Sequence, residues 1–175
     1  MRIHSKLVTV ALSAGLALAI ATPASAAVTL VSVTVTGGVL SLSAPVGSVN
    51  LGSRANTVGG GTLSGPLGEV QVTDARSAAA GAGWIVSVIS TALTPTSGPT
   101  IGAALIGYTV GSITQVGTAT YTANNPANLT GVLPAITATA ISGDNSATWN
   151  PTINVAIPGG IAAGIYTGSI THSLI

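Results

Sequence analysis

Few side chains in this sequence have the chemistry that catalysis needs. Of 175 residues, 3 are acidic, 4 are basic and 2 are histidine, and there is no cysteine. A catalytic triad needs a histidine that is oriented by a carboxylate and set beside a nucleophile. The only histidine beyond the N-terminal segment is His172, in the run Ser169–Leu174. We interpret it as a strand residue, partly exposed or packed near the end of a sheet.

The acidic side chains are also too scattered for other common acid chemistry. Glycoside hydrolysis needs two carboxyl groups across a cleft, but Glu69 and Asp74 have opposite parity on one expected strand and so point to opposite faces. Asp144 lies in the turn-like run SGDNS, and one acid beside one asparagine is weak support for a calcium site. The sequence therefore predicts a protein that is not an enzyme and holds no metal or cofactor.

Charge is scarce along the whole chain, and this excludes further classes of protein. Charged residues make up 4%, against about a quarter in an average soluble domain. So few basic residues leave no electrostatic footprint for nucleic acid. A hydrophobic content of 47% disfavours intrinsic disorder. The absence of cysteine excludes disulfides and thiolate metal sites.

The first 26 residues are organised like a secretory signal peptide. Arg2 and Lys6 precede an uncharged apolar run over residues 7–21, and Ala24-Ser25-Ala26 supplies a small-residue cleavage site. The alternative is an uncleaved membrane anchor, but the run is shorter than the roughly 20 residues that span a bilayer. We expect cleavage after Ala26 and a secreted mature chain, residues 27–175, that forms one domain without a membrane span.

Alternating β-branched residues predict strands along the mature chain. The first expected strand is Ala27–Thr36, which Gly37-Gly38 would turn into a hairpin with residues 39–42. Clusters of Pro, Gly, Ser and Asn separate the later runs, and helical periodicity does not occur. This pattern predicts an all-β fold, an antiparallel Greek-key or immunoglobulin-like β-sandwich over residues 27–175. The other expected strands are residues 68–73, 83–91, 103–110, 117–123, 135–142, 147–157 and 165–174.

Local features refine this fold. Tyr166 follows Gly164 at the start of a strand, as in the tyrosine corner of Greek-key sandwiches, where the hydroxyl bonds back to the main chain. Gly59-Gly60-Gly61, with Gly65 and Pro66, predicts a mobile loop within the domain. Because there is no Phe, we expect the core to consist mainly of Val, Ile, Leu and Ala.

The most informative stretch contains Asp74, Arg76 and Trp84. Asp74 and Arg76 have the same parity on an extended chain, so they could pair at the end of a strand. In a chain with so little charge, we favour a structural role for this pair, which would fix the geometry of a loop. Trp84 opens the next apolar strand, and we favour a place in the core over sugar stacking.

These residues resemble a known family. The pattern V-x-V-x-D-x-R, a small-residue loop and then G-W-x-V-x-V is similar to the first motif of WxL-domain surface proteins of Gram-positive bacteria. The segment Gly164–Leu174 resembles the closing strand of that family. Two departures are evident: Trp84-Ile85-Val86 is W-x-V rather than W-x-L, and His172 stands where the second tryptophan would be. Trp149 has no place in either motif.

The resemblance implies a secreted protein held noncovalently at the cell surface. Its ligand would be peptidoglycan or another cell-wall polymer, with other surface proteins or copies of itself as possible partners and a role in adhesion. The ligand-binding residues that it implies are Trp84, His172 and Leu174, whereas Asp74, Arg76 and Tyr166 would be structural.

A structural subunit that assembles into a surface layer or fibre is the alternative. Strands that are rich in Thr and Val and lack lysine leave sheet edges unguarded, so edge pairing between copies is physically plausible. A wall-binding module should be a monomer that sediments with walls, whereas a fibre subunit should form large assemblies without them.

Overall fold

The computed structural model describes residues 29–175 and divides the chain into two units, residues 1–34 and 35–175. The described part of the first unit, residues 29–34, is exposed and lies in no strand. The predicted signal peptide lies outside the described residues. No helix within residues 29–175 is long and apolar enough to cross a membrane.

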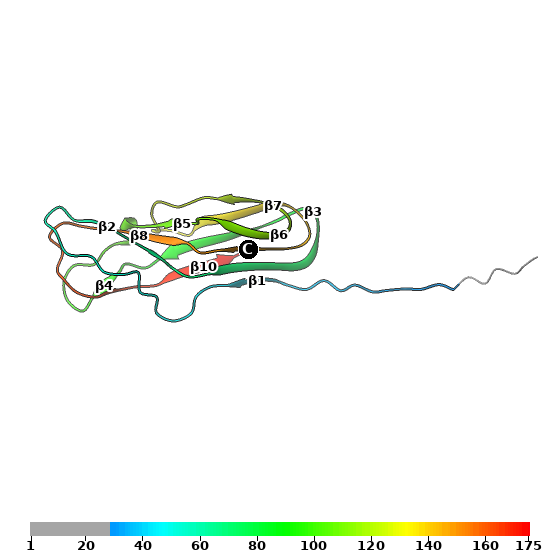
Figure 1. The fold of residues 1–175 in the computed structure, drawn as a ribbon, viewed down its shortest axis with the longest axis horizontal. Coiled ribbons are helices and arrows are strands. Elements are labelled where there is room, and N and C mark those ends of the chain that lie inside the picture. The colour runs from blue at the N-terminus through cyan, green and yellow to red at the C-terminus, as the bar shows by residue number, and fades with distance from the viewer. Residues whose placement is uncertain (1–28) are drawn as a thin grey trace, which may run out of the picture. The chain divides into compact units, whose positions relative to one another are not determined.

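The second unit is an all-β sandwich, as the sequence predicts, in which the paired strands run antiparallel (Figure 1). One short 3₁₀ helix, η1 (Ala103–Leu105), interrupts the strands. The strands are β1 (Leu40–Ser43), β2 (Gly61–Pro66), β3 (Val70–Ser90), β4 (Thr94–Pro95), β5 (Ile106–Thr109), β6 (Ile113–Ala123), β7 (Leu133–Trp149), β8 (Thr152–Ile157), β9 (Tyr166–Thr167) and β10 (Ile170–Leu174).

The larger sheet has the order β1-β3-β7-β6, and β10 pairs with the second half of β3. A smaller sheet has the order β2-β8-β5, and β4 pairs with β9. The larger sheet and the β2-β8-β5 sheet both contribute side chains to one buried core, which includes Val72, Val86, Trp149, Ile153 and Val155. The predicted Val, Ile, Leu and Ala core is thus confirmed, with both tryptophans and Tyr108 added to it.

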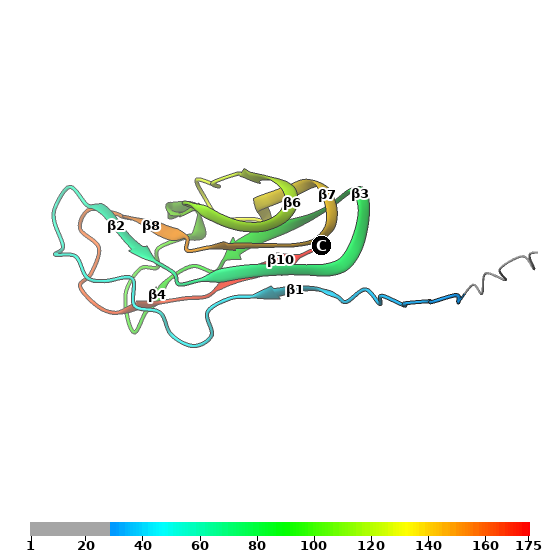
Figure 2. The same cartoon turned by 45° about the vertical axis from the view of Figure 1, so that its right-hand side comes forward.

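The bend in β3 and β7 is the feature that the sequence did not predict. The runs 68–73 and 83–91, expected as separate strands, are the two limbs of β3, which curves back on itself with β7 beside it (Figure 2). Their pairing register shifts repeatedly between Asp74 and Trp84. Small residues fill this stretch, and bulges of this kind bend a strand and increase its twist. Left-handed backbone at Gly81 and Gly143, with φ of 93° and 72°, accommodates the turn.

Other predictions about secondary structure are also wrong. Residues 29–36 are not in a strand, because nothing among the described residues pairs with them, and the expected hairpin with residues 39–42 does not form. Instead Leu40–Ser43 pairs with β3. The predicted glycine loop ends at Gly60, because residues 61–66 form β2 against β8.

Candidate functional site

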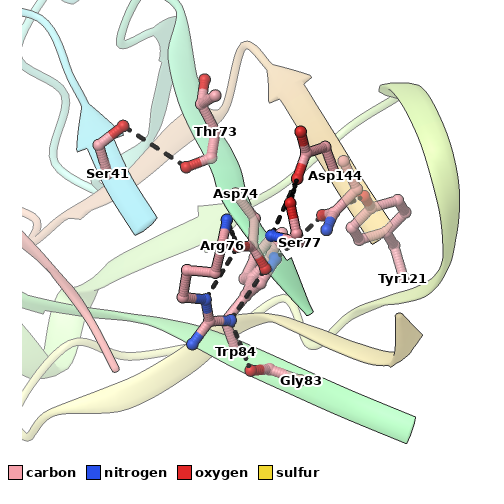
Figure 3. Close-up of polar contacts among 10 residues, drawn as sticks. Ser41, Thr73, Asp74, Arg76, Ser77, Gly83, Trp84, Tyr121 and Asp144 are labelled. Carbon is pink, nitrogen blue, oxygen red and sulfur yellow. Dashed lines mark hydrogen bonds and ion pairs between the residues drawn. The ribbon is translucent and has the colours of Figure 1, made fainter. Parts of the chain in front are cut away.

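The Asp74–Arg76 pair lies at the beginning of the bend and is confirmed. The Asp74 carboxylate is fully buried and accepts two bonds of 2.8 Å from the Arg76 guanidinium, through Nε and Nη2 (Figure 3). It also accepts a bond from the Arg76 backbone N–H at 3.1 Å. These Arg76 bonds lower the pKa of Asp74 below its ordinary value.

Arg76 also connects the two limbs of β3. Its Nη2 donates to the Gly83 carbonyl at 3.3 Å, beyond the small-residue turn. Asp144, on the neighbouring strand β7, accepts from the backbone N–H of Ser77 at 2.9 Å and from its hydroxyl at 3.2 Å. The predicted turn residue Asp144 therefore lies within β7 and holds the bend of β3. The sequence predicts that the Asp74–Arg76 pair fixes the geometry of a loop, and the bond from Arg76 to the Gly83 carbonyl spans the turn in this way.

A buried polar cluster forms the inner side of the bend. Trp84 is 2% exposed, and its indole Nε1 donates to Oδ1 of Asn145 at 3.3 Å. Tyr121 of β6 donates its hydroxyl to the same oxygen at 3.2 Å, and its ring lies 5.6 Å from the Trp84 ring. Among residues 29–175, the Nδ2 of Asn145 has no hydrogen-bond partner. Burial and the Asp74 carboxylate raise the pKa of Tyr121.

The predicted place of Trp84 in the core is confirmed. Trp84 is one of the residues beside a shallow apolar hollow of about 400 Å³, together with Ile85, Ala138 and Ile175. With 2% of its surface exposed, the indole offers no open face on which a sugar could stack.

His172 belongs to a second hydrogen-bonded line, between β10 and the core. Its Nε2 lies 3.0 Å from the hydroxyl of Tyr108, and that hydroxyl accepts the indole N–H of Trp149 at 2.9 Å. Burial lowers the pKa of His172 and raises that of Tyr108. Trp149 therefore has a structural role, because its indole N–H gives the buried Tyr108 hydroxyl a hydrogen-bond partner inside the core.

Leu174 and His172 share the core-facing side of β10. In the register of the sheet His172 lies opposite Val88 and Leu174 opposite Val86, and both valines are fully buried. Directly opposed residues share one face of a sheet. Trp84, His172 and Leu174 thus have packing positions, and their role in ligand binding stays a prediction.

Tyr166 makes the contact that its position predicts. Its hydroxyl donates to the carbonyl of Ala162, four residues upstream, at 2.8 Å. The backward bond of a tyrosine corner is therefore present at the start of β9.

The outer surface of the larger sheet carries two rows of side chains, of which seven have a hydroxyl or amide group and one, Val116, is apolar. One row crosses the four strands β1, β3, β7 and β6, and a second row lies two residues along each strand. Sheet geometry separates neighbouring strands by about 4.8 Å and successive rows by roughly 6.8 Å. We call this surface the polar face; its rows are Ser43, Gln71, Thr148 and Thr114, and then Ser41, Thr73, Ser146 and Val116.

Some side chains on the polar face make hydrogen bonds, and several of them are exposed to solvent. Gln71 donates to the hydroxyl of Thr148 at 3.0 Å, and the Ser41 hydroxyl donates to the Thr73 carbonyl at 3.5 Å (Figure 3). Gln71, Thr73 and Ser41 are exposed. None of the eight residues that define the polar face is charged.

Within residues 29–175, no three acidic or histidine side chains gather in a group that could hold a metal ion. Of the three acids among these residues, Glu69 is exposed, Asp74 accepts bonds from Arg76, and Asp144 accepts bonds from Ser77.

Sequence reasoning missed Asn145, Tyr121, Tyr108 and the polar face. Tyr121 and Ala119 alternate with exposed threonines in β6, so the period of two could have indicated an inward tyrosine. The polar face has no comparable signal, because its rows are built from four strands that are far apart in the chain.

Comparison with known proteins gives no relative: no family model, no curated protein and no solved structure matches this chain. The site is therefore interpreted from its own geometry.

Proposed function

We propose that this chain is a secreted, non-catalytic cell-surface protein that associates noncovalently with the cell wall and mediates surface contacts. The observation that carries the proposal is the polar face, an open sheet surface of hydroxyl and amide groups without charge. Its partner would be the glycan part of peptidoglycan or a similar wall polymer.

The chemistry of such a polymer suits this face. Glycan strands present hydroxyl and acetamido groups in a repeating array, which can exchange hydrogen bonds with serine, threonine and glutamine side chains. Each such bond contributes only about 0.5–1.5 kcal/mol. Binding would therefore depend on many weak contacts along a repeating ligand, which is the case of high avidity.

In this proposal the bend acts as a support. Asp74, Arg76 and Asp144 hold the two limbs of β3, and the first limb contributes Gln71 and Thr73 to the polar face. Trp84, His172 and Leu174 would contribute by packing beneath the sheets rather than by touching the polymer.

Cosedimentation with purified Gram-positive cell walls tests the proposal. The test variant is Gln71→Ala with Thr73→Ala, which removes an amide and a hydroxyl from the middle of the polar face. The matched control is Thr171→Ala with Ser173→Ala, which removes two exposed hydroxyls from β10. Loss of two hydrogen bonds of about 1 kcal/mol each should weaken wall binding roughly 30-fold in the test variant.

Wall binding by the unmodified protein and by the control, with loss in the test variant, would support the polar face. Equal binding by all three would show that the polymer is recognised elsewhere. Failure of the unmodified protein to sediment with walls would reject the proposed function.

A second candidate function is a self-assembling subunit of a surface layer or fibre. The observation that favours it is the edge of β6, which among the described residues pairs only with β7 and has neither charge nor proline over Ile113–Ala123. Size-exclusion chromatography of the protein without walls separates the two candidates, because only the subunit should elute as large assemblies.

A further inference from the structure

Residues 29–36 have the sequence of a strand but no strand partner among the described residues. The segment reads TLVSVTVT, and Leu30, Val31, Val33 and Val35 are 93, 85, 83 and 85% exposed. Apolar side chains exposed in a continuous run indicate an interaction surface more than single exposed residues do. We call residues 29–36 the arm.

The outer edge of β6, in turn, has no strand beside it in the described structure. Strand β6 ends the order β1-β3-β7-β6, so its outer N–H and C=O groups lack a neighbouring strand in the described structure. A register shift at Gly117, whose φ is 84°, separates a first part from Thr118–Ala123, and a second shift in the pairing with β7 follows between Thr118 and Thr120. In this second part Ala119 and Tyr121 are only partly buried, which leaves apolar surface at the edge.

The other sheet edges are poorer templates for an added strand. Strands β1 and β10 span 4 and 5 residues, against 11 for β6. The edge of β5 is already covered, because the Tyr108 N–H donates to the Pro126 carbonyl. At β2, Arg54 donates to the carbonyls of Gly60 and Thr62.

We propose that the arm of one copy adds as a strand to the β6 edge of a second copy, along Thr118–Ala123. Main-chain hydrogen bonds give affinity in this mode of recognition, and alternate side chains give specificity. The inference rests on the second candidate function and names the contact by which copies would join.

Apolar and hydroxyl residues alternate in the arm and in the second part of β6. In a strand, Val31, Val33 and Val35 share one face, and Leu30, Ser32, Thr34 and Thr36 share the other. Placed beside β6, the valines cover the side of Ala119 and Tyr121, and the hydroxyl residues continue the exposed row of Thr118, Thr120 and Thr122. Neither segment carries a charge that would oppose the contact.

The contact is also of the kind that propagates. The arm and the β6 edge are different surfaces, so each copy can give its arm to one neighbour and accept an arm from another. Such heterologous contacts produce open filaments when the rotation between copies does not close a ring.

Two single substitutions in the arm test the inference in the purified protein. Val33→Lys puts a charge on the face that would meet β6, whereas Ser32→Lys adds the same charge to the other face and is the matched control. Both positions are exposed and lie outside the strands, so neither change should disturb the sandwich. Light scattering and electron microscopy should show assemblies for the unmodified protein and for Ser32→Lys, and their loss for Val33→Lys.

Cross-linking locates the contact independently. Because the chain has no cysteine, Thr34→Cys and Thr120→Cys can be introduced separately and the two variants mixed. The inference predicts a disulfide between the two different variants that exceeds the homodimers of either one.

The outcomes separate this inference from the function on which it rests. Assemblies that survive Val33→Lys, or mixed variants that do not cross-link preferentially, would overturn arm exchange while leaving self-assembly in place. A protein that stays monomeric at every concentration would overturn both. Sedimentation with walls is measured separately and decides the first candidate function.

Discussion

Replacement of Trp84 by alanine tests whether this tryptophan is a core residue or a ligand residue. A buried tryptophan removes roughly 150–250 Å² from water, and its truncation to alanine costs about 3–5 kcal/mol in well-packed cores. The ring of Tyr121, 5.6 Å away, loses its aromatic neighbour. Asn145 Oδ1 keeps the hydroxyl of Tyr121 as a donor, so no acceptor is left unpaired. We therefore expect the free energy of unfolding to fall by about 4 kcal/mol.

Equilibrium unfolding in urea, followed by far-ultraviolet circular dichroism, measures this change. Trp84→Phe is the graded control: it keeps an aromatic ring beside Tyr121 and loses the indole N–H and part of the volume, so it should cost about 1–2 kcal/mol. It also keeps the test interpretable if Trp84→Ala does not fold. A Trp84→Ala protein within about 1 kcal/mol of the unmodified stability that no longer sediments with walls would refute the assignment to the core.

Three further predictions concern the hydrogen-bonded groups. Arg76 lowers the pKa of Asp74, so as the pH falls this carboxyl takes up a proton in the unfolded chain before it does so in the folded protein. Stability should therefore fall as the pH drops below about 4. Urea midpoints measured from pH 5 to 2 should fall less steeply in Asp74→Asn than in the unmodified protein. Burial lowers the pKa of His172, so stability should decrease as the pH falls below the ordinary histidine pKa of 6.5. In His172→Gln the urea midpoint should change less between pH 7 and 5 than in the unmodified protein. An unchanged pH profile would contradict this. Tyr166→Phe removes the bond to the Ala162 carbonyl and should cost about 1 kcal/mol in thermal or urea unfolding, whereas no loss would mean that the corner does not stabilise the fold.

The burial of the predicted ligand residues changes how wall association should be sought. If the first motif acted through an open indole, Trp84 would have to present its ring, and it is 2% exposed. The polar face does present uncharged groups that are open to solvent, such as those of Gln71 and Thr73. Variants on that face therefore test recognition, whereas variants at Trp84 test stability.

Local patterns were enough to predict the elements whose partners are close in sequence. Asp74 and Arg76 lie two residues apart, and such residues share one side of an extended chain, so the spacing allows the pair that the structure shows as a bidentate bond. The contact of Tyr166 with Ala162 spans four residues and was also predicted. In contrast, the strand expected at 27–36 failed over its described residues, because strand propensity expresses fit to a neighbouring strand and none is present.

The sequence by itself determined an all-β sandwich with a Val, Ile, Leu and Ala core, because alternation and turn residues act over a few positions. Only the tertiary structure decided that β3 and β7 bend, that Trp84 and Tyr121 meet on Asn145, and that two polar rows cross four strands. These features depend on the register between strands that are tens of residues apart. That register is fixed when the whole core packs, and no local pattern contains it.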